Sequence, residues 1–243
     1  MKPFFSYFGS KHRSAPFYPA PKFDTIIEPF AGSAGYSTHI SRGRKVILID
    51  KDPIICELWK YLISVSEKEI LSLPDIKPDQ TIEDFKVGES AKILIGFWLN
   101  KACSYPQKKP SSWMIKDINK KYQYWGYEKR LLIASQLKNI RHWEIKQGDY
   151  FDVQKTPVTW FIDPPYVDKG KYYKCGSKSI DFNKLEKWCK SLPGQGIVCE
   201  QFGAEWLPFR PFKTVKSTMH NYSSELIWTK NCMFQPALME VEQ

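Results

Sequence analysis

The 243-residue sequence has few histidines and no closely spaced cysteines. Its four histidines and six cysteines include no Cys-x-x-Cys pair, and no histidine stands at a metal-ligand spacing from a cysteine. This pattern excludes the common structural zinc motifs, and we expect no bound metal. The cysteines are expected to be reduced thiols, as they are in cytoplasmic proteins.

Long hydrophobic runs are also missing. The longest apolar run, at residues 93–99, is far shorter than the roughly 20 residues that a membrane span needs. The amino-terminal residues lack the apolar stretch of a signal peptide. We therefore expect a cytoplasmic protein with no membrane contact. Hydrophobic residues make up 42% and charged residues 26% of the chain, which is typical of a sequence that folds throughout.

Seven short segments rich in β-branched and aromatic residues predict strands, and four longer segments with apolar residues at helical spacing predict helices. The predicted strands are 25–28, 45–50, 142–146, 158–162, 196–201, 212–217 and 225–229, and the predicted helices are 53–65, 89–102, 127–140 and 182–192. Strands that alternate with helices indicate an α/β fold, with a doubly wound, Rossmann-like sheet of seven strands. The last two strands are joined through residues 218–224 without a helix, which predicts a terminal antiparallel hairpin.

About ninety residues separate the second predicted strand from the third, far more than one crossover helix needs. We expect a main domain of residues 1–55 and 141–243, and an inserted small helical subdomain of residues 56–140. Much of the net charge of +10 lies in this insertion or directly after it. Between residues 101 and 146, eleven basic residues stand against three acidic ones (Asp117, Glu128 and Glu144). The basic residues are Lys101, Lys108, Lys109, Lys116, Lys120, Lys121, Lys129, Arg130, Lys138, Arg141 and Lys146.

Aromatic residues are interleaved with these basic ones, a combination that favours a nucleic-acid surface over a basic face that only aids solubility. The first lysines of the stretch are the candidate DNA contacts: Lys101, Lys108, Lys109 and Lys116. Each of them is predicted to be either a phosphate contact or a bystander.

A glycine-rich turn follows the first predicted strand, at residues 28–35. Such a turn lets the backbone approach a ligand closely, although many are only tight connections. It lacks the Lys-Ser/Thr of a phosphate-binding loop, which disfavours a nucleotide triphosphatase. The second strand ends at Asp50, about twenty residues further on, where a carboxylate can accept hydrogen bonds from ribose hydroxyls. Asp149 is placed to hold an adenine amino group, and both acids are also suited to helix capping.

The fourth predicted strand ends in Asp163-Pro164-Pro165-Tyr166. The prolines fix the backbone and donate no amide hydrogens, so Asp163 and the Pro164 carbonyl can form a rigid pair of acceptors. Both can accept from one exocyclic amino group, which makes the nitrogen lone pair more available for attack on a methyl donor. Tyr166 then offers a face on which an extruded base can stack. The alternative is a proline-rich turn that only ends a buried strand.

With these segments, the chain resembles the Dam-like DNA adenine methyltransferases. The resemblance includes Tyr7-Phe8-Gly9-Ser10-Lys11, the glycine turn, the Asp-Pro-Pro-Tyr turn and Glu225-Leu226-Ile227-Trp228-Thr229. It implies transfer of a methyl group from S-adenosylmethionine to N6 of a flipped-out adenine in double-stranded DNA, in the cytoplasm of a bacterial or phage-infected cell. The catalytic residues that it implies are Asp163, Pro164 and Tyr166. The cofactor contacts expected from the resemblance or from the residues themselves are Tyr7, Lys11, Phe30, Gly32, Asp50, Asp149 and Asp163.

The resemblance fails from residue 102 to residue 129, where the family usually carries its recognition loop. The sequence therefore predicts no target sequence for the DNA. Cytosine carbon-5 methylation is excluded because no cysteine follows a proline. Cytosine N4 methylation remains the nearest alternative, and methylation of RNA or of a protein glutamine is more distant. A further alternative is not an enzyme: a DNA-binding protein that keeps the fold but no longer catalyses methyl transfer.

Overall fold

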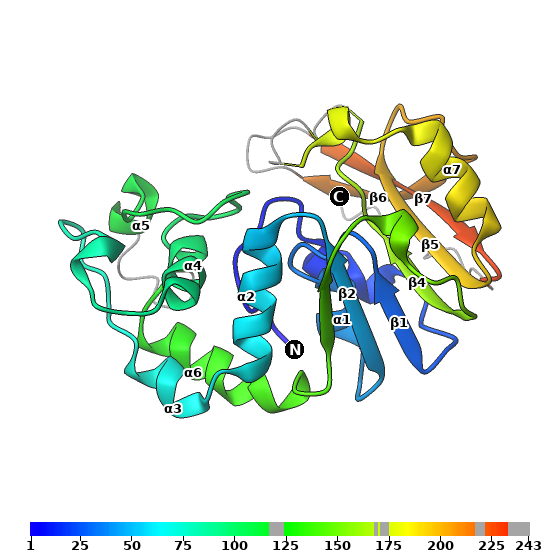
Figure 1. Cartoon of the computed structure of the whole chain (residues 1–243). Coiled ribbons are helices and arrows are strands. Elements are labelled where there is room, and N and C mark those ends of the chain that lie inside the picture. The colour runs from blue at the N-terminus through cyan, green and yellow to red at the C-terminus, as the bar shows by residue number, and fades with distance from the viewer. Residues whose placement is uncertain (117–123, 168–169, 171–174, 217–221, 233–243) are drawn as a thin grey trace.

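The computed structural model describes residues 1–116, 124–167, 170, 175–216 and 222–232 (Figure 1). Seven strands form one mixed sheet in the order β3-β2-β1-β4-β5-β7-β6. Its strands are β1 (Thr25–Glu28), β2 (Lys45–Asp50), β3 (Glu144–Gln147), β4 (Val158–Ile162), β5 (Gly194–Gln201), β6 (Arg210–Lys216) and β7 (Tyr222–Lys230). Strand β7 runs antiparallel to both of its neighbours, and the other pairings are parallel. The predicted α/β class and the antiparallel pair at the end of the sheet are confirmed.

Three of the strands, β1, β2 and β4, begin and end at the predicted residues. All five residues of β4 are buried, as expected for a central parallel strand with a continuous apolar run. The edges of the antiparallel part were harder to predict, and β5 begins two residues earlier than expected, at Gly194. Strand β7 extends beyond its apolar segment at both ends, because its first residues pair with β6 and its last residue, Lys230, pairs with Gly196 of β5.

Both faces of the sheet are covered by helices, and the two halves of the core are separated by β4. Helices α1 (Gly35–Ile40) and α2 (Pro53–Ser64) cover one face, and α7 (Phe182–Ser191) covers the other (Figure 1). Successive side chains of a strand point to opposite faces. Phe161 accordingly stacks on Tyr36 of α1, with ring centroids 4.3 Å apart, while Trp160 meets the edge of Trp188 on α7.

The connection from β3 to β4 departs from the alternation of strands and α-helices. It contains only a single 3₁₀ turn, Tyr150–Asp152, with Asp149 as its N-cap. This connection crosses from one edge of the parallel strands, past β2 and β1, to the far side of β1. The chain order therefore reverses between β1 and β4, and ligands of open α/β sheets bind at such a reversal, at the carboxyl ends of the strands.

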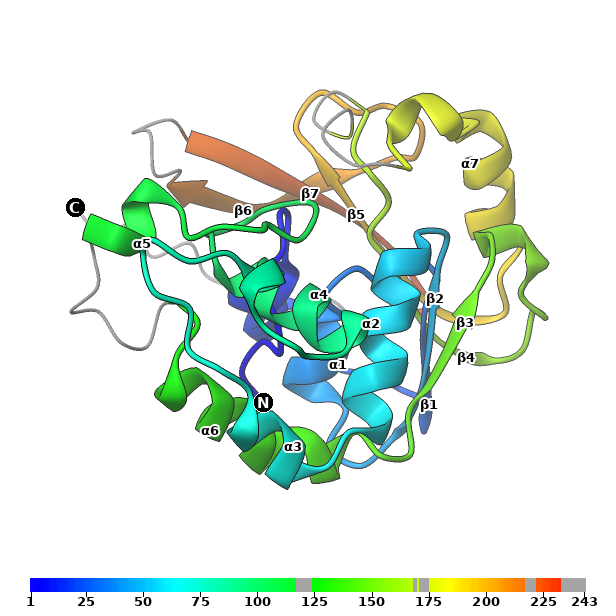
Figure 2. The ribbon, with the colours of Figure 1, turned by 60° about the vertical axis from the view of Figure 1, so that its left-hand side comes forward.

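The inserted helices are α3 (Glu67–Ser72), α4 (Glu89–Trp98), α5 (Ser112–Lys116) and α6 (Tyr127–Gln136). They form a lobe on one side of the sheet, in which α4 lies along α2 and α3 lies along α6 (Figures 1 and 2). Helix α2 runs across residue 56 without a break. The ring of Phe5 packs against both Trp59 of α2 and Phe97 of α4, so the lobe and the sheet share one hydrophobic core.

Two predicted helices of the lobe are shorter than expected. Helix α4 ends at Trp98 instead of residue 102, and Ala102 has a positive φ of 49°, which an α-helix cannot include. Helix α6 ends at Gln136 and continues as a 3₁₀ turn, Leu137–Asn139. No helix within the described ranges has the length and apolar character needed to cross a membrane.

The amino-terminal segment packs onto the start of α1 through a glycine. A Cβ atom at Gly35 would lie 2.8 Å from the backbone nitrogen of His12 and 2.9 Å from that of Lys11. We expect Gly35→Ala to lower the free energy of unfolding by about 1–3 kcal/mol, because backbone must move to admit the methyl group. Urea unfolding would measure the loss.

The matched control is Gly148→Ala, since the Cβ added there would meet only Asp152 Oδ2, at 3.9 Å. It is expected to change stability by less than about 0.5 kcal/mol. Equal stability of the two variants would contradict close packing of the amino-terminal segment on α1.

Candidate active site

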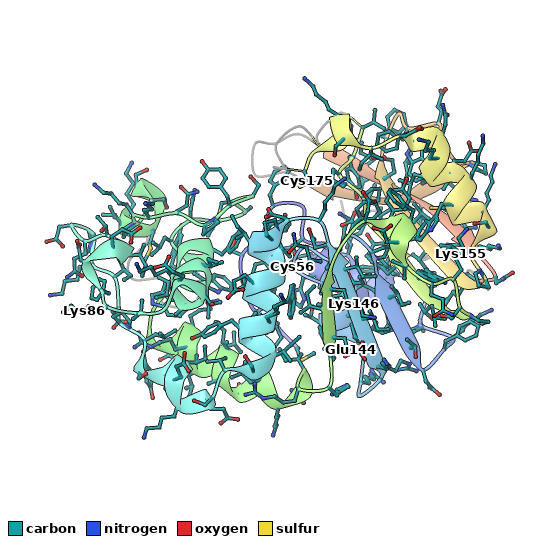
Figure 3. All side chains as sticks on the ribbon, in the orientation of Figure 1. Cys56, Lys86, Glu144, Lys146, Lys155 and Cys175 are labelled. Atoms are coloured by element: carbon teal, nitrogen blue, oxygen red, sulfur yellow. The ribbon has the colours of Figure 1, made fainter. Side chains whose placement is uncertain are left out.

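A pocket opens at the carboxyl ends of β1, β2 and β4, at the reversal of strand order. It contains about 900 Å³ of space, counting the part open to solvent. All of the predicted cofactor contacts line it: Tyr7, Lys11, Phe30, Gly32, Asp50, Asp149 and Asp163. These side chains come from five separate segments of the chain. Cys175 also lines the pocket and marks its position in Figure 3.

The glycine turn shapes one wall of the pocket. Gly32 has a φ of +44°, a left-handed conformation that L side chains rarely adopt, and its amide donates to Asp50 Oδ2 at 2.9 Å. A Cβ at this position would lie 2.9 Å from Cε1 of Tyr7. Gly32 is therefore required both for the turn and for the close approach of the Tyr7 ring.

Asp50 lies in the pocket and does not cap a helix. The N-cap of α2 is Asp52, whose side chain accepts from the amide of Ile54. Asp50 Oδ1 accepts from the amide of Asp52 at 2.9 Å, so both of its oxygens are oriented by backbone donors. Burial raises the pKa of Asp50 to about 6, against the lowering effect of these amides. Each carboxylate oxygen still has a lone pair for a ligand hydroxyl.

Asp149 is the N-cap of the 3₁₀ turn Tyr150–Asp152, as the alternative prediction of a capping role had it. It also lines the pocket. Its Oδ1 accepts from the amide of Tyr150 at 2.7 Å, and its Oδ2 pairs with Lys51 Nζ at 2.8 Å. The ring of Tyr150 stacks on Phe30, with centroids 5.4 Å apart. An aromatic wall and a fixed carboxylate therefore stand side by side, a combination suited to a planar heterocycle that carries an amino group.

Asp163 and Lys11 form a buried ion pair at the floor of the pocket. Lys11 Nζ lies 2.8 Å from both carboxylate oxygens and donates a hydrogen bond to Oδ2. It also donates to the carbonyl of Gly9 at 2.9 Å. Within the part of the chain that is described, the buried Oδ1 atom of Asp163 has no partner in hydrogen-bond geometry. Burial raises the pKa of Asp163 to about 6, while the Lys11 ammonium opposes the rise.

Tyr166 lies beside this ion pair, although it does not line the pocket. Lys11 Nζ is 4.7 Å from the centroid of its ring, and its hydroxyl donates to Glu225 Oε1 at 3.2 Å. Pro164 is buried, and Pro165 is the proline that reaches the pocket. The structure thus brings Asp163 to the ligand side of the turn and places Tyr166 behind it.

Two buried glutamates, one in the wall of the pocket and one behind it, were not predicted as site residues from the sequence. Glu28 ends β1, is 2% exposed, and accepts the amide of Ser37 at 2.7 Å. Glu225 accepts from Tyr18 and Tyr166 behind the pocket. Both glutamates stand in apolar strands, and a charged residue in such a strand is the signal that could have identified them.

The candidate DNA contacts lie on and beyond the loop after α4. Lys101 Nζ is 5.2 Å from the ring of Tyr124, Lys108 pairs with Glu83 at 3.0 Å, and Lys109 and Lys116 are exposed. The amide of Phe8, a pocket residue, donates to the carbonyl of Cys103 at 3.1 Å. This hydrogen bond holds the basic loop next to the pocket. Lys120 and Lys121 lie outside the described residues.

Comparison with known proteins adds no family assignment: no protein-family model matches this chain, and no curated protein is significantly similar to it. Among the described residues, no group of three or more histidines, cysteines and acids is arranged to hold a metal ion. The interpretation of the pocket therefore rests on its own residues.

The buried carboxyl group of Glu28 predicts a pH dependence of stability. Burial raises its pKa from 4.5 to about 8, so the folded protein holds a proton that the unfolded chain releases at a lower pH. The contribution of Glu28 to the free energy of unfolding therefore falls as the pH rises from about 4.5 to about 8. Glu28→Gln removes this titration, and the variant should gain stability relative to the wild type across that window. Urea unfolding near both ends of the window measures the difference.

The exposed Glu205→Gln serves as the control for loss of one carboxyl group. If the difference in stability between Glu28→Gln and the wild type stays constant across the window, then Glu28 is not a neutral, buried acid in the folded protein.

Proposed function

We propose that this protein is an S-adenosylmethionine-dependent DNA methyltransferase that acts on N6 of a flipped-out adenine in double-stranded DNA. One observation carries the proposal. Every predicted cofactor contact, drawn from five separate segments, lines a single pocket at the reversal of the strand order, with Asp163 at its floor. The seven-stranded sheet with its antiparallel end supports a methyltransferase fold of the Rossmann-like type.

The residues of the pocket fit the cofactor. Asp50 offers carboxylate oxygens for ribose hydroxyls, and the Phe30 ring with Asp149 suits an adenine and its amino group. Lys11 supplies a positive charge for the methionine carboxylate. When bound, S-adenosylmethionine supplies an electrophilic methyl group.

Asp163 is suited to orient and activate the target nitrogen. Its Oδ1 atom is buried and is contacted by Lys11 Nζ at 2.8 Å. A carboxylate oxygen accepts from amino-group donors, so an exocyclic amino group is a suitable ligand for it. The Pro164 carbonyl is the proposed second acceptor. The nitrogen loses one proton when it gains the methyl group, and Asp163, hydrogen-bonded to that nitrogen, is the acceptor for it on this chain.

Lys11 must shift before the target base can bind in this way. Its ammonium lies 2.8 Å from both oxygens of Asp163, including the oxygen assigned to the amino group. Extruding the base from DNA costs a few kcal/mol, and stacking on an aromatic ring returns roughly 1–3 kcal/mol per base. Stacking alone therefore barely balances extrusion. Tyr166, the expected stacking face, lies behind Asp163 and does not line the pocket, so hydrogen bonds to Asp163 must contribute the rest.

The electrostatics of the pocket argue against a protein that only binds DNA. Burial disfavours the charged form of Asp163, and a buried ion pair is weak as a source of stability. If the protein carried out no reaction here, apolar residues in place of Lys11 and Asp163 would leave the fold at least as stable. Cytosine N4 methylation uses the same amino-group chemistry and stays the alternative, because the choice of adenine rests on Asp163 as the first residue of the turn. The basic loop beside the pocket favours a nucleic acid over a protein glutamine.

Asp163→Ala is expected to abolish methyl transfer and to leave DNA binding within about threefold of the wild type. The variant loses the proposed acceptor of the amino group but keeps the basic loop. Transfer of labelled methyl groups from S-adenosylmethionine to DNA of varied sequence, followed by analysis of the modified base, measures the activity. Fluorescence anisotropy with the same DNA measures binding.

The control is Asp79→Ala, which removes an exposed carboxylate outside the pocket and should retain full activity. The proposal fails if wild-type protein that binds the cofactor labels no DNA. If the methyl groups are found on cytosine N4, cytosine and not adenine is the target base, and the reaction is still methylation of an amino group.

The double variant of Lys108 and Lys109 to alanine should weaken DNA binding and reduce its dependence on salt. Each phosphate contact that is lost lowers the slope of log K against log salt concentration by about 0.9. Binding titrations over a series of salt concentrations give the slope. A reduced slope places at least one of these two lysines on the DNA backbone.

The matched control is the double variant of Lys45 and Lys155 to alanine. Lys45 begins β2 and Lys155 precedes β4, so both lie at the amino-terminal ends of the strands, away from the pocket (Lys155 is labelled in Figure 3). Lys45 is paired with Glu144 as Lys108 is with Glu83. If both double variants lower the slope equally, the DNA surface does not lie on the loop after α4.

A further inference from the structure

Glu225 of β7 is a buried acid that joins three separate segments behind the pocket. It is 9% exposed, and its Oε1 atom accepts from the hydroxyl of Tyr18 at 2.7 Å and from that of Tyr166 at 3.2 Å. The same oxygen lies 3.8 Å from Lys11 Nζ. Glu225 thus contacts the amino-terminal segment and the turn after β4 at the same point.

The position of this carboxylate is fixed from several sides. The ring of Tyr18 stacks on Phe212 of β6, with centroids 4.6 Å apart and planes 7° from parallel, and it is also packed against Phe161. In the sheet, Glu225 pairs with Gln201 of β5 and with Lys213 of β6. A side chain held in this way is a stationary charge, whereas Lys11 ends in a flexible stem.

Lys11 therefore lies between two carboxylates, one in contact and one about 1 Å further away. Its present partner, Asp163, is the residue that the proposed reaction requires for the target amino group. An ammonium that left Asp163 would keep its hydrogen bond to the Gly9 carbonyl, but it would lose the carboxylate that offsets its desolvation. Glu225 offers a charged acceptor that a small shift of the Lys11 side chain can reach.

We propose that Glu225 is a positioning residue of the methyl-transfer site, which receives the Lys11 ammonium when the target amino group binds Asp163. The inference rests on the proposed function. In this arrangement Glu225 touches neither base nor cofactor. It makes Asp163 available by giving Lys11 a second carboxylate, and it does so without exposing the lysine to solvent.

Glu225→Gln tests the proposal, because the amide oxygen can still accept from both tyrosine hydroxyls while the negative charge is lost. The single-turnover rate of methyl transfer, at saturating DNA and cofactor, should fall about ten- to a hundredfold, since Lys11 then stays on Asp163. The dissociation constant for S-adenosylmethionine should change by less than about twofold. A purely structural glutamate would lower the melting temperature without this selective loss of rate.

A double-mutant cycle with Lys11→Met isolates the mechanism. If Glu225 acts through Lys11, Glu225→Gln should change the rate less than about twofold once Lys11 has been replaced. Tyr18→Phe is the matched control, because it removes a hydrogen bond to the same oxygen and leaves both carboxylates and the lysine in place. It is expected to reduce stability while retaining the rate of transfer.

Glu225→Asp is the second variant if the glutamine variant does not fold. This variant keeps a buried charge, but its side chain is one methylene shorter. Its rate of methyl transfer is expected to lie between those of the wild type and of Glu225→Gln. A wild-type rate in a folded Glu225 variant, or equal losses with and without Lys11, overturns the role of Glu225 and leaves the proposed function intact. A wild-type protein that transfers no methyl group would overturn both.

Discussion

The ion pair between Lys11 and Asp163 is the interaction on which the site depends. It ties the amino-terminal segment, which belongs to no strand, to the carboxyl end of the central strand β4. Two glycines make it possible: Gly35 admits the backbone of Lys11 and His12 against α1, and Gly32 admits the ring of Tyr7. Residues 7–11 form one wall of the pocket, so the site is complete only with this segment in place.

The pair also sets the electrostatics of the pocket. Burial raises the pKa of Glu28 to about 8 and those of Asp50 and Asp163 to about 6, so these three acids resist ionisation. Lys11 is the cation in direct contact with Asp163, and its ammonium favours the charged carboxylate there. A site of this kind is less stable than an apolar core, but its carboxylates strongly favour donors and cations. Such a site suits a sulfonium cofactor and an amino group.

Local pattern was enough to predict the centre of the sheet and most of the pocket. The apolar runs of β1, β2 and β4 are bounded by turn residues, and the carboxyl ends of β2 and β4 carry the predicted acids Asp50 and Asp163. The lengths of α4 and β7 depend on contacts with other segments, which no local pattern contains. Glu225 was missed as a site residue for the same reason. Its partners Tyr18 and Tyr166 are 207 and 59 residues away in the sequence, and only the folded chain brings the three together.

The way in which the basic loop is attached explains how it can differ from the loop of a related family while the pocket keeps the expected residues. The loop is held to the pocket mainly by its backbone. The carbonyl of Cys103 accepts from the amide of Phe8, and the amide of Ala102 donates to Ser6 Oγ. Neither bond uses a side chain of the loop, so side chains such as Lys108 can change without moving Tyr7 or Lys11. Under the proposed function, target choice and methyl transfer can therefore vary independently, since the loop and the pocket share these backbone contacts.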